Sequence, residues 1–380
     1  MSRTWDEQAG ELARALSLNQ EERDYCERYR ITSADELHAD LLASPSLERT
    51  DPRIRRAQLL TDLEQFLSPA YRRELSGPDP DIALGFDFSQ SLRDNSPKVR
   101  AALTGWPGET RSPDLNDEEG VDLLGHWPPL WPVRDQGFSE PTCVPFAVNA
   151  CQEWEDLKPG IGASRLGSVF LYQRIRSQLG PGSGQGGTKL TEVEAIMPVE
   201  GVCREALWPD SSSITAAPSA SALNDAATRR RAAQCADLGW NNPSRLPGPA
   251  RTTLELLRLG RPVAITIPTF RDPMSTSKTT NWTDAYARVT GVVRPKKANW
   301  DFVGGHAVCI LGFQPATKDT LGGYFIFRNS WGDRFAKQPL TPAAPQGGGK
   351  PVEPTVPARG YGAIGASEIE AYVSELLFFP

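Results

Sequence analysis

The sequence predicts an α+β protein of two lobes that follows a small all-α region. Residues 1–75 carry apolar residues at helical spacing together with N-cap signals, which indicates several short helices. After residue 120, helical patterns come first and short β-type runs bounded by glycine come later, which favours segregated helices and strands. Residues 76–119 are rich in Pro, Gly and Asp, as in turns and extended connections. We therefore predict a helical region at 1–75, a linker at 76–119 and a two-lobe domain at 120–380.

The N-terminal region carries start signals for three helices. Asn19 is followed by Glu22, and Ser33 by Glu36, at the spacing of a capping box. Pro52 stands where the first turn of a helix tolerates proline, ahead of further apolar residues at helical spacing. Three or four such helices form a bundle, and their apolar stripes more often make its core than a binding groove.

The region after residue 120 has a mixed pattern. Apolar residues at helical spacing predict helices at 143–157, 168–179 and 228–238. Short β-type runs predict strands at 262–267, 306–313 and 324–331. Two segments of low complexity, 181–187 and 337–359, should be exposed loops, and the second is long enough to be mobile.

Composition excludes several classes of function. The formal net charge of −6, without a Lys/Arg-rich run, argues against a nucleic-acid partner. No apolar stretch reaches the roughly 18–20 residues that cross a bilayer, so we expect no membrane partner. The N-terminus lacks the pattern of a secretory signal, and the six cysteines include no CxxC pair. We expect a cytoplasmic protein with free thiols and with no metal site or cofactor.

Cys143 is the candidate nucleophile. It stands where a turn-rich approach gives way to a predicted helix, and Pro145 falls in the first turn of that helix. A thiol at a helix N-terminus feels the positive end of the helix dipole, which lowers its pKa and favours the nucleophilic thiolate. A lone cysteine is more often a buried structural thiol. We expect that role for the five other cysteines: Cys26, Cys151, Cys203, Cys235 and Cys309.

His306 and Asn329 are the candidate base and its orienting partner. Histidine occurs at only three positions, and His306 opens a β run directly after two glycines, where a nucleophile and a substrate can both reach it. Asn329 ends a later β run, and its side-chain oxygen can accept a hydrogen bond from a histidine N–H and hold one tautomer. His126, in an aromatic and proline-rich segment, should be structural or exposed near the lobe interface.

Together, and in the order Cys, His, Asn, these signals resemble the papain family of cysteine peptidases over roughly residues 120–380. The segments that carry the resemblance are PVRDQG (132–137), Cys143 with Phe146, GQGGT (184–188), VCREALWPD (202–210), GGHAV (304–308), RNSWGD (328–333) and GYGAIGASEIEAYV (360–373). The resemblance implies a papain-like fold, with a helical lobe and a β-barrel-like lobe. It also implies a peptide or protein substrate. The missing signal and the short motifs favour a bacterial intracellular protease.

The resemblance assigns a role to each candidate residue. Cys143 would attack the peptide carbonyl as a thiolate, His306 would protonate the leaving amine, and Asn329 would orient His306. The Gln136 side-chain amide, with the Cys143 backbone N–H, would form the oxyanion hole. Four further residues are assigned to the substrate side of the site, where glycine lets the peptide lie close and Trp331 shields the His306–Asn329 contact: Gly186, Gly187, Gly305 and Trp331.

The sequence departs from the family pattern near the nucleophile. The loop from Gln136 to Cys143 is one residue longer than usual and lacks the family's cysteine, which puts the placement of Gln136 in doubt. Val144 replaces the usual tryptophan after the nucleophile, and Pro145 replaces a small residue. The insertion at 337–359 lies before the last strand and could lean over the cleft and restrict substrates.

Alternatives stay open for the activity and for the helical region. The same residues would serve an isopeptidase, an amidase or a transglutaminase-like enzyme, and a peptidase-derived binding module without turnover is a further alternative. Residues 1–75 do not match the family's inhibitory propeptide, so we expect an adaptor-like unit that recruits a protein partner. If this region inhibits instead, deleting residues 1–118 should raise activity.

Overall fold

The structure is a computed structural model of the whole chain, and it describes most of the predicted domain and helical region. The described residues are 5–44, 47, 51–75, 112–126, 133–137, 141–157, 164–178, 186–213, 215–239, 248–342 and 349–380. Residues 76–111 lie outside this part, so the linker prediction can be followed only at 112–119. The α+β fold class predicted from the sequence is confirmed.

In its described residues the N-terminal region consists of short helices joined by turns. Its helices are α1 (Trp5–Ala15), α2 (Gln20–Arg28), α3 (Ala34–Leu42), α5 (Arg56–Leu63), the 3₁₀ turn η1 (Glu64–Phe66) and α6 (Pro69–Leu75). The predicted capping box begins α2, because Asn19 Oδ1 accepts from the Glu22 N–H at 2.9 Å and the Asn19 N–H donates to Glu22 at 2.9 Å. Ser33 caps α3 through its hydroxyl alone. We call this group of helices the N-terminal unit.

A seven-stranded antiparallel sheet forms the core of one lobe. Its strands follow the order β2-β7-β3-β4-β5-β6, and β1 pairs with β4 beside this path. They are β1 (Val121–Asp122), β2 (Gln234–Asp237), β3 (Val263–Arg271), β4 (Asp301–Pro315), β5 (Gly323–Arg328), β6 (Tyr361–Gly365) and β7 (Glu375–Phe378). Every residue of β5 and all but the last of β3 are buried, so both faces of the sheet are covered. We call this sheet, with the helices that follow β2 in the chain, the β lobe.

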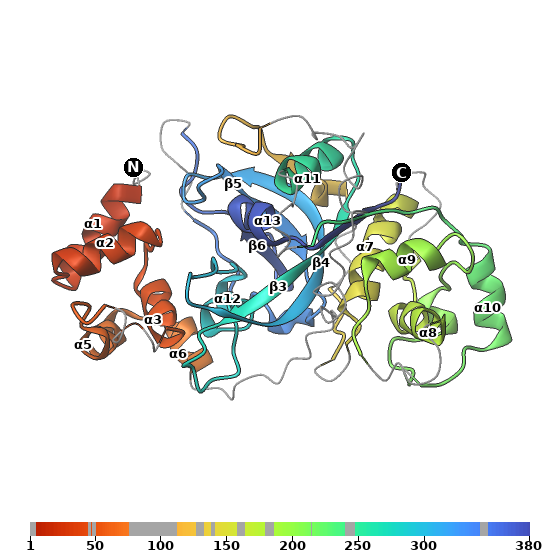
Figure 1. Cartoon of the computed structure of the whole chain (residues 1–380), viewed down its shortest axis with the longest axis horizontal. Helices are drawn as coiled ribbons and strands as arrows, with labels where there is room; N and C mark the ends of the chain where they lie inside the picture. Colours follow the sequence, from red (N-terminus) through yellow and green to blue (C-terminus); the bar gives the residue numbers. More distant parts are fainter. Residues whose placement is uncertain are drawn as a thin grey trace.

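Helices before the sheet form the second lobe. They are η3 (Leu124–His126), α7 (Cys143–Leu157), α8 (Ser168–Gln178), α9 (Leu190–Ile196), η4 (Glu205–Leu207) and α10 (Ala220–Ala227). The β lobe adds α11 (Pro249–Arg258), α12 (Ala285–Thr290), η5 (Gly332–Arg334) and α13 (Ala366–Tyr372). Figure 1 shows the sheet in the middle, with α8–α10 on one side and the N-terminal unit on the other. Helix α7 packs directly on β3 and β4.

The prediction of a helix at 228–238 is wrong. Helix α10 ends at Ala227, and Gln234–Asp237 form strand β2, which pairs antiparallel with β7. The Cys235 N–H donates to Glu194 at 2.9 Å on the other side. The sheet edge thus satisfies the backbone of these residues, and this tertiary pairing overrides their helical pattern.

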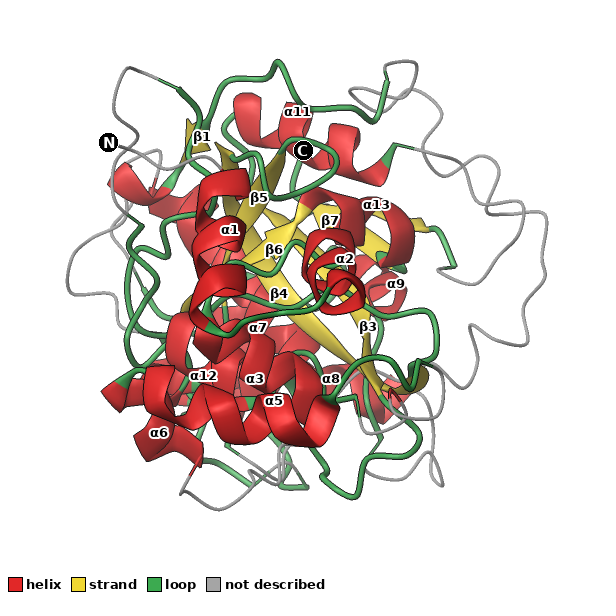
Figure 2. Ribbon diagram, turned by 90° about the vertical axis from the view of Figure 1, so that its left-hand side faces the viewer, coloured by secondary structure: helices red, strands yellow, loops and turns green. Residues whose placement is uncertain are grey.

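The N-terminal unit docks on the β lobe through buried charges. Arg294 Nη1 lies 2.8 Å from Asp40 on α3, and Lys297 contacts the same carboxylate. Lys318 lies 2.7 Å from Glu36 at the start of α3. Figure 2, viewed from this side, shows the N-terminal unit on the near side of the molecule, with α1 and α2 in front of the sheet. The unit is therefore packed against the β lobe, on the side away from α8–α10.

The Pro/Gly-rich insertion is anchored where the structure describes it, at 337–342 and 349–359. The Leu340 N–H donates to the Thr290 carbonyl at 3.0 Å, and Glu353 pairs with Lys318 at 2.8 Å. Gln314 exchanges two hydrogen bonds with the backbone of Thr355. These partners belong to the β lobe near the N-terminal unit. Among the described helices, none combines the length and apolar character needed to span a membrane.

Candidate active site

Cys143 is the first residue of α7, and its side chain is fully buried. The helix begins after Thr142, whose carbonyl accepts from the Phe146 N–H at 3.2 Å. Pro145 lies in the first turn, where no intrahelical donor is needed. The predicted placement of the thiol at a helix N-terminus is confirmed. The first N–H groups of a helix carry a partial positive charge, which favours a thiolate or a developing oxyanion placed at this end.

His306 and Asn329 are brought together by the pairing of β4 with β5. Cys309 is in register with Arg328, so His306 and Asn329 lie near the same end of the two strands. His306 Nε2 is 2.8 Å from Asn329 Oδ1. The same Oδ1 accepts from the Ser330 N–H at 2.8 Å, which identifies it as the amide oxygen.

This hydrogen bond fixes the tautomer of His306. An amide oxygen can only accept, so Nε2 carries the proton and Nδ1 presents a lone pair. Nδ1 has no hydrogen-bond partner among the described residues. The ring is therefore oriented with its basic nitrogen available to take a proton from a nucleophile.

Two tryptophans enclose the imidazole. Trp331 stacks on it, with centroids 4.3 Å apart and planes 23° apart. Trp282 meets it edge-on at 5.3 Å. His306 is fully buried, and this burial lowers its pKa to about 4, while the hydrogen bond to Asn329 acts in the opposite direction. The resting imidazole is thus neutral near pH 7.

Gln136 lies beside the strand-end segment that carries Asn329. The Gln136 N–H donates to the Ser330 carbonyl at 2.8 Å, and Ser330 Oγ donates to Gln136 Oε1 at 2.5 Å. Asp135 forms a bridge with Trp331. The side chain is buried, and its oxygen is engaged by Ser330, so the orientation of the amide is fixed by the segment after β5. Residues 138–140 of the longer loop lie outside the described residues.

Helix α7 and strand β4 contact each other at two positions along their lengths. Ala147 and Ala150 of α7 line a small void together with Ala307 of β4. Farther along both elements, Cys151 Sγ lies 3.3 Å from Cys309 Sγ. The two elements therefore run alongside each other, and Cys143 and His306 lie at the same end of the pair.

Comparison with known proteins finds solved structures of similar fold. No family model matches the chain, and no curated protein matches it in sequence. Xylellain, a cysteine protease from Xylella fastidiosa, superimposes with a TM-score of 0.51 at 16% identity, over 80% of this chain and 97% of its own. A structure concerned with the mite allergens Blo t 1 and Der p 1 gives 0.47 at 14% identity, over 97% of each chain. ProCathepsin B S9 from Trypanosoma congolense gives 0.45 at 14%, over 83% of this chain and 88% of its own.

The chain has the fold of the papain-like cysteine proteases. At these identities the likeness concerns the fold alone. The papain-like fold predicted from the short motifs is confirmed, whereas the roles of the individual site residues stay predictions.

A buried ion-pair network connects α7 to the segments that precede Gln136 and Asn329. Glu153 of α7 accepts from Arg134 at 3.0 Å and from the Leu166 N–H at 2.8 Å, and Arg328 lies 3.6 Å away. Arg134 precedes Gln136 by two residues, and Arg328 immediately precedes Asn329. Because Glu153 sits on the helix that begins with Cys143, one carboxylate ties together the segments that carry three predicted site residues.

Sequence reasoning missed this network and Trp282. In the sequence Glu153 resembles an ordinary surface charge on a helix, with Asn149 and Asp156 on the same side, so no local signal marks it. Trp282 lies far from every motif, in the segment between β3 and α12, so nothing local connects it to His306.

The predicted substrate-side glycines lie in two places. Gly186 and Gly187 follow α8, and their carbonyls accept from Tyr172 at 2.8 Å and Arg176 at 3.0 Å. These contacts hold the loop against α8. Gly305 pairs with Pro268 of β3, one residue before His306. The substrate-binding role of the three glycines stays a prediction.

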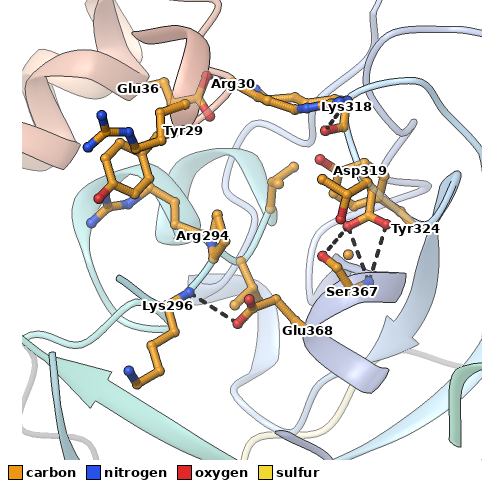
Figure 3. A pocket seen from close by; sticks show the side chains of 16 residues that line it. Tyr29, Arg30, Glu36, Arg294, Lys296, Lys318, Asp319, Tyr324, Ser367 and Glu368 are labelled. Atoms are coloured by element: carbon orange, nitrogen blue, oxygen red, sulfur yellow. Dashed lines mark hydrogen bonds and ion pairs between the residues drawn. The ribbon is translucent and has the colours of Figure 1, made fainter. Parts of the chain in front are cut away.

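A cavity between the N-terminal unit and the β lobe is separate from the candidate active site. It has a volume of about 240 Å³, and none of Cys143, His306 and Asn329 lines it. Its polar groups are largely paired with one another: the Lys296 N–H donates to Glu368, and Ser367 donates to Asp319 (Figure 3). Within the described residues, no group of three or more His, Cys, Asp and Glu side chains is arranged to hold a metal ion.

Proposed function

We propose that this protein is a cysteine peptidase that hydrolyses peptide bonds through Cys143, His306 and Asn329. The observation that carries the proposal is the 2.8 Å contact between His306 Nε2 and Asn329 Oδ1. It presents Nδ1 of His306 as the base, next to the helix that Cys143 begins. A buried thiol without a catalytic task would need no such oriented imidazole.

The reaction follows from the atoms in place. Nδ1 of His306 takes the Cys143 thiol proton, and Sγ bonds to the carbonyl carbon of the scissile peptide. The negative charge moves to the carbonyl oxygen, which the Gln136 amide and the first N–H groups of α7 stabilise. The imidazolium gives its proton to the leaving nitrogen as the C–N bond breaks, leaving a thioester. Water, deprotonated by His306, then attacks the thioester, and Sγ leaves.

The neutral resting state of His306 fits this sequence. Burial between Trp331 and Trp282 disfavours the imidazolium, so the ring is charged stably only beside the thiolate or the developing oxyanion. The hydrogen bond from Nε2 to Asn329 stabilises that charged form. Cytoplasmic location and recruitment of a partner by the N-terminal unit remain separate proposals, based on sequence alone.

Labelling by an epoxide peptide that reacts with activated cysteines tests the proposal. Intact and peptide mass spectrometry should show one adduct, on Cys143, in the wild-type protein, and none in Cys143→Ala. His306→Ala should react much more slowly. Cys203→Ala is the matched control, because burial raises the pKa of the Cys203 thiol to about 12 and its loss should leave labelling unchanged. No adduct on Cys143 at any pH from 5 to 8 would support a binding module instead.

A substrate panel separates a peptidase from other acyl-transfer enzymes on the same fold. Peptides blocked at both ends should be cleaved internally if the enzyme is an endopeptidase. Turnover of isopeptides or simple amides alone, with Cys143 still labelled, would assign the same residues to a different acyl transfer.

A further inference from the structure

Two buried thiols meet at the contact between α7 and β4. Cys151 Sγ lies 3.3 Å from Cys309 Sγ, and both side chains are fully buried. Cys151 follows Cys143 by eight residues on α7, and Cys309 follows His306 by three residues on β4. The cysteine pair therefore lies between α7, which carries the proposed nucleophile, and β4, which carries the proposed base. Neither Cys151 nor Cys309 takes part in the proposed reaction.

The separation is close to that needed for a covalent bond. A disulfide has its sulfurs about 2.05 Å apart, so the two Sγ atoms need to approach by about 1.3 Å. Helix α7 already packs on β4 over its length, from the void shared by Ala147 and Ala307 to the cysteine pair itself. Rotation of the two cysteine side chains is the movement that would bring the sulfurs together.

Both cysteines of the pair are free thiols in the structure. None of the six cysteines, all of which lie in the described part of the chain, forms a disulfide. Burial and the neighbouring Cys309 raise the pKa of the Cys151 thiol well above its ordinary value, so little thiolate is present near pH 7. Because both thiols are shielded, a reagent that reaches them has to be small.

We propose that Cys151 and Cys309 are a disulfide site, which a small peroxide oxidises to a covalent link between α7 and β4. One sulfur attacks a peroxide oxygen and becomes a sulfenic acid, releasing one water. The second sulfur attacks that sulfenic sulfur, so that the S–S bond forms, the S–O bond breaks and a second water leaves. The two thiols lose two protons and two electrons in total, and hydrogen peroxide takes them up.

The link closes a long loop that contains most of the catalytic domain. The cysteines are 158 residues apart in sequence, and a cross-link over such a length removes much of the freedom of the unfolded chain. The disulfide also connects α7, which begins with Cys143, to β4, which contains His306. It lies away from the atoms that would react. The oxidised protein should therefore keep its native structure and resist unfolding better than the reduced protein.

The decisive experiment uses full-length protein with Cys143→Ala, which removes the candidate nucleophile as a competing target for peroxide. After treatment with hydrogen peroxide, the intact mass should fall by two hydrogens. A tryptic digest without reductant should contain peptide 135–165 joined to peptide 298–318, and dithiothreitol should separate them. The unfolding temperature of the oxidised protein should be several degrees higher than that of the reduced protein.

Two further variants serve as controls. Cys143→Ala/Cys151→Ala and Cys143→Ala/Cys309→Ala should show neither the joined peptides nor the temperature shift. Cys143→Ser replaces Cys143→Ala as the parent if the alanine protein is not folded. Recovery of residues 151 and 309 as separate thiols or sulfinic acids, or joined to other cysteines, would overturn the proposal. A joined pair with an unchanged or lower unfolding temperature would overturn it as well, because it would show that the link does not fit the native contact.

Discussion

Trp331 lies face to face with His306, their ring centroids 4.3 Å apart, immediately beside the hydrogen bond from His306 to Asn329. The tryptophan therefore covers one face of the imidazole and keeps water from the Nε2–Oδ1 contact. A sequence motif of four residues, NSWG at 329–332, supplies both the orienting amide and this cover. The same enclosure lowers the pKa of His306. This affects the stability of the protein as well as its catalysis.

Stability should decrease as the pH falls from about 6.5 to 4, partly because of His306. Its pKa is about 4 in the folded protein and near 6.5 when unfolded, so the unfolded chain binds more protons in this range. The neutral ring contributes its full stability above pH 6.5. The loss toward pH 4 is about 3 kcal/mol, at about 1.4 kcal/mol per pKa unit. Urea unfolding of Cys143→Ala at several pH values measures it.

His306→Gln in the same background is the matched variant, because glutamine fills a similar volume and does not titrate. Its free energy of unfolding should change less between pH 6.5 and 4 than that of the parent. Parallel curves for the two proteins would show that His306 does not titrate with a lowered pKa.

Asn329→Ala should lower kcat/KM by about 10- to 100-fold, since the imidazole loses the acceptor that holds its tautomer. The loss should appear mainly in kcat, because Asn329 orients the base and is not placed to bind substrate. Asn299→Ala, an exposed asparagine of the same lobe, should change neither constant. A purely structural role for Asn329 would instead reduce the folded fraction at unchanged kcat per labelled site.

Gln136→Ala should reduce kcat by about 10²- to 10³-fold, the range for removal of one oxyanion donor. Ser330→Ala should have a smaller effect in the same direction, because it leaves the amide in place and removes only the 2.5 Å contact that orients it. Steady-state kinetics on one peptide substrate compares the two variants. A larger loss in Ser330→Ala than in Gln136→Ala would contradict the assigned role of Gln136.

The sequence predicted best those parts of the protein in which chemistry is local. Cys143 at the start of a helix and the Asn19 capping box depend on neighbours within a few residues, and the structure places both as predicted. The papain-like fold was predicted from several short motifs that occur in the order Cys, His, Asn. Strand β2 was mispredicted, because its pairing partner β7 lies about 140 residues later and no local pattern announces it.

The buried charges could not be predicted for the same reason. Glu153 meets Arg134 and Arg328 across three elements, and Asp40 meets Arg294 some 250 residues away. In the sequence each of these residues resembles an ordinary surface charge. Only the folded chain shows that they are buried and paired, and therefore that the N-terminal unit and the β lobe depend on each other.

Asp40→Ala should destabilise the protein by about 3–5 kcal/mol, the usual loss when one partner of a buried ion pair is removed. Arg294 keeps Asp284 at 2.8 Å, but Lys297 loses its carboxylate, and burial already lowers the pKa of Lys297 to about 8. Deleting residues 1–118 removes Asp40 and Glu36 together, so a change in activity after that deletion would mix inhibition with loss of fold. The point variant separates these effects.

Asp24→Ala is the matched control, since Asp24 lies exposed on α2, where its carboxylate accepts a hydrogen bond from Gln20. Urea unfolding should distinguish the two variants, and limited proteolysis should cleave the N-terminal unit sooner in Asp40→Ala. Activity per labelled Cys143 should be equal in both proteins, because the docking site lies on the far side of the β lobe from α8–α10. Higher activity in Asp40→Ala, in step with release of the N-terminal unit, would instead show that the unit restrains the enzyme.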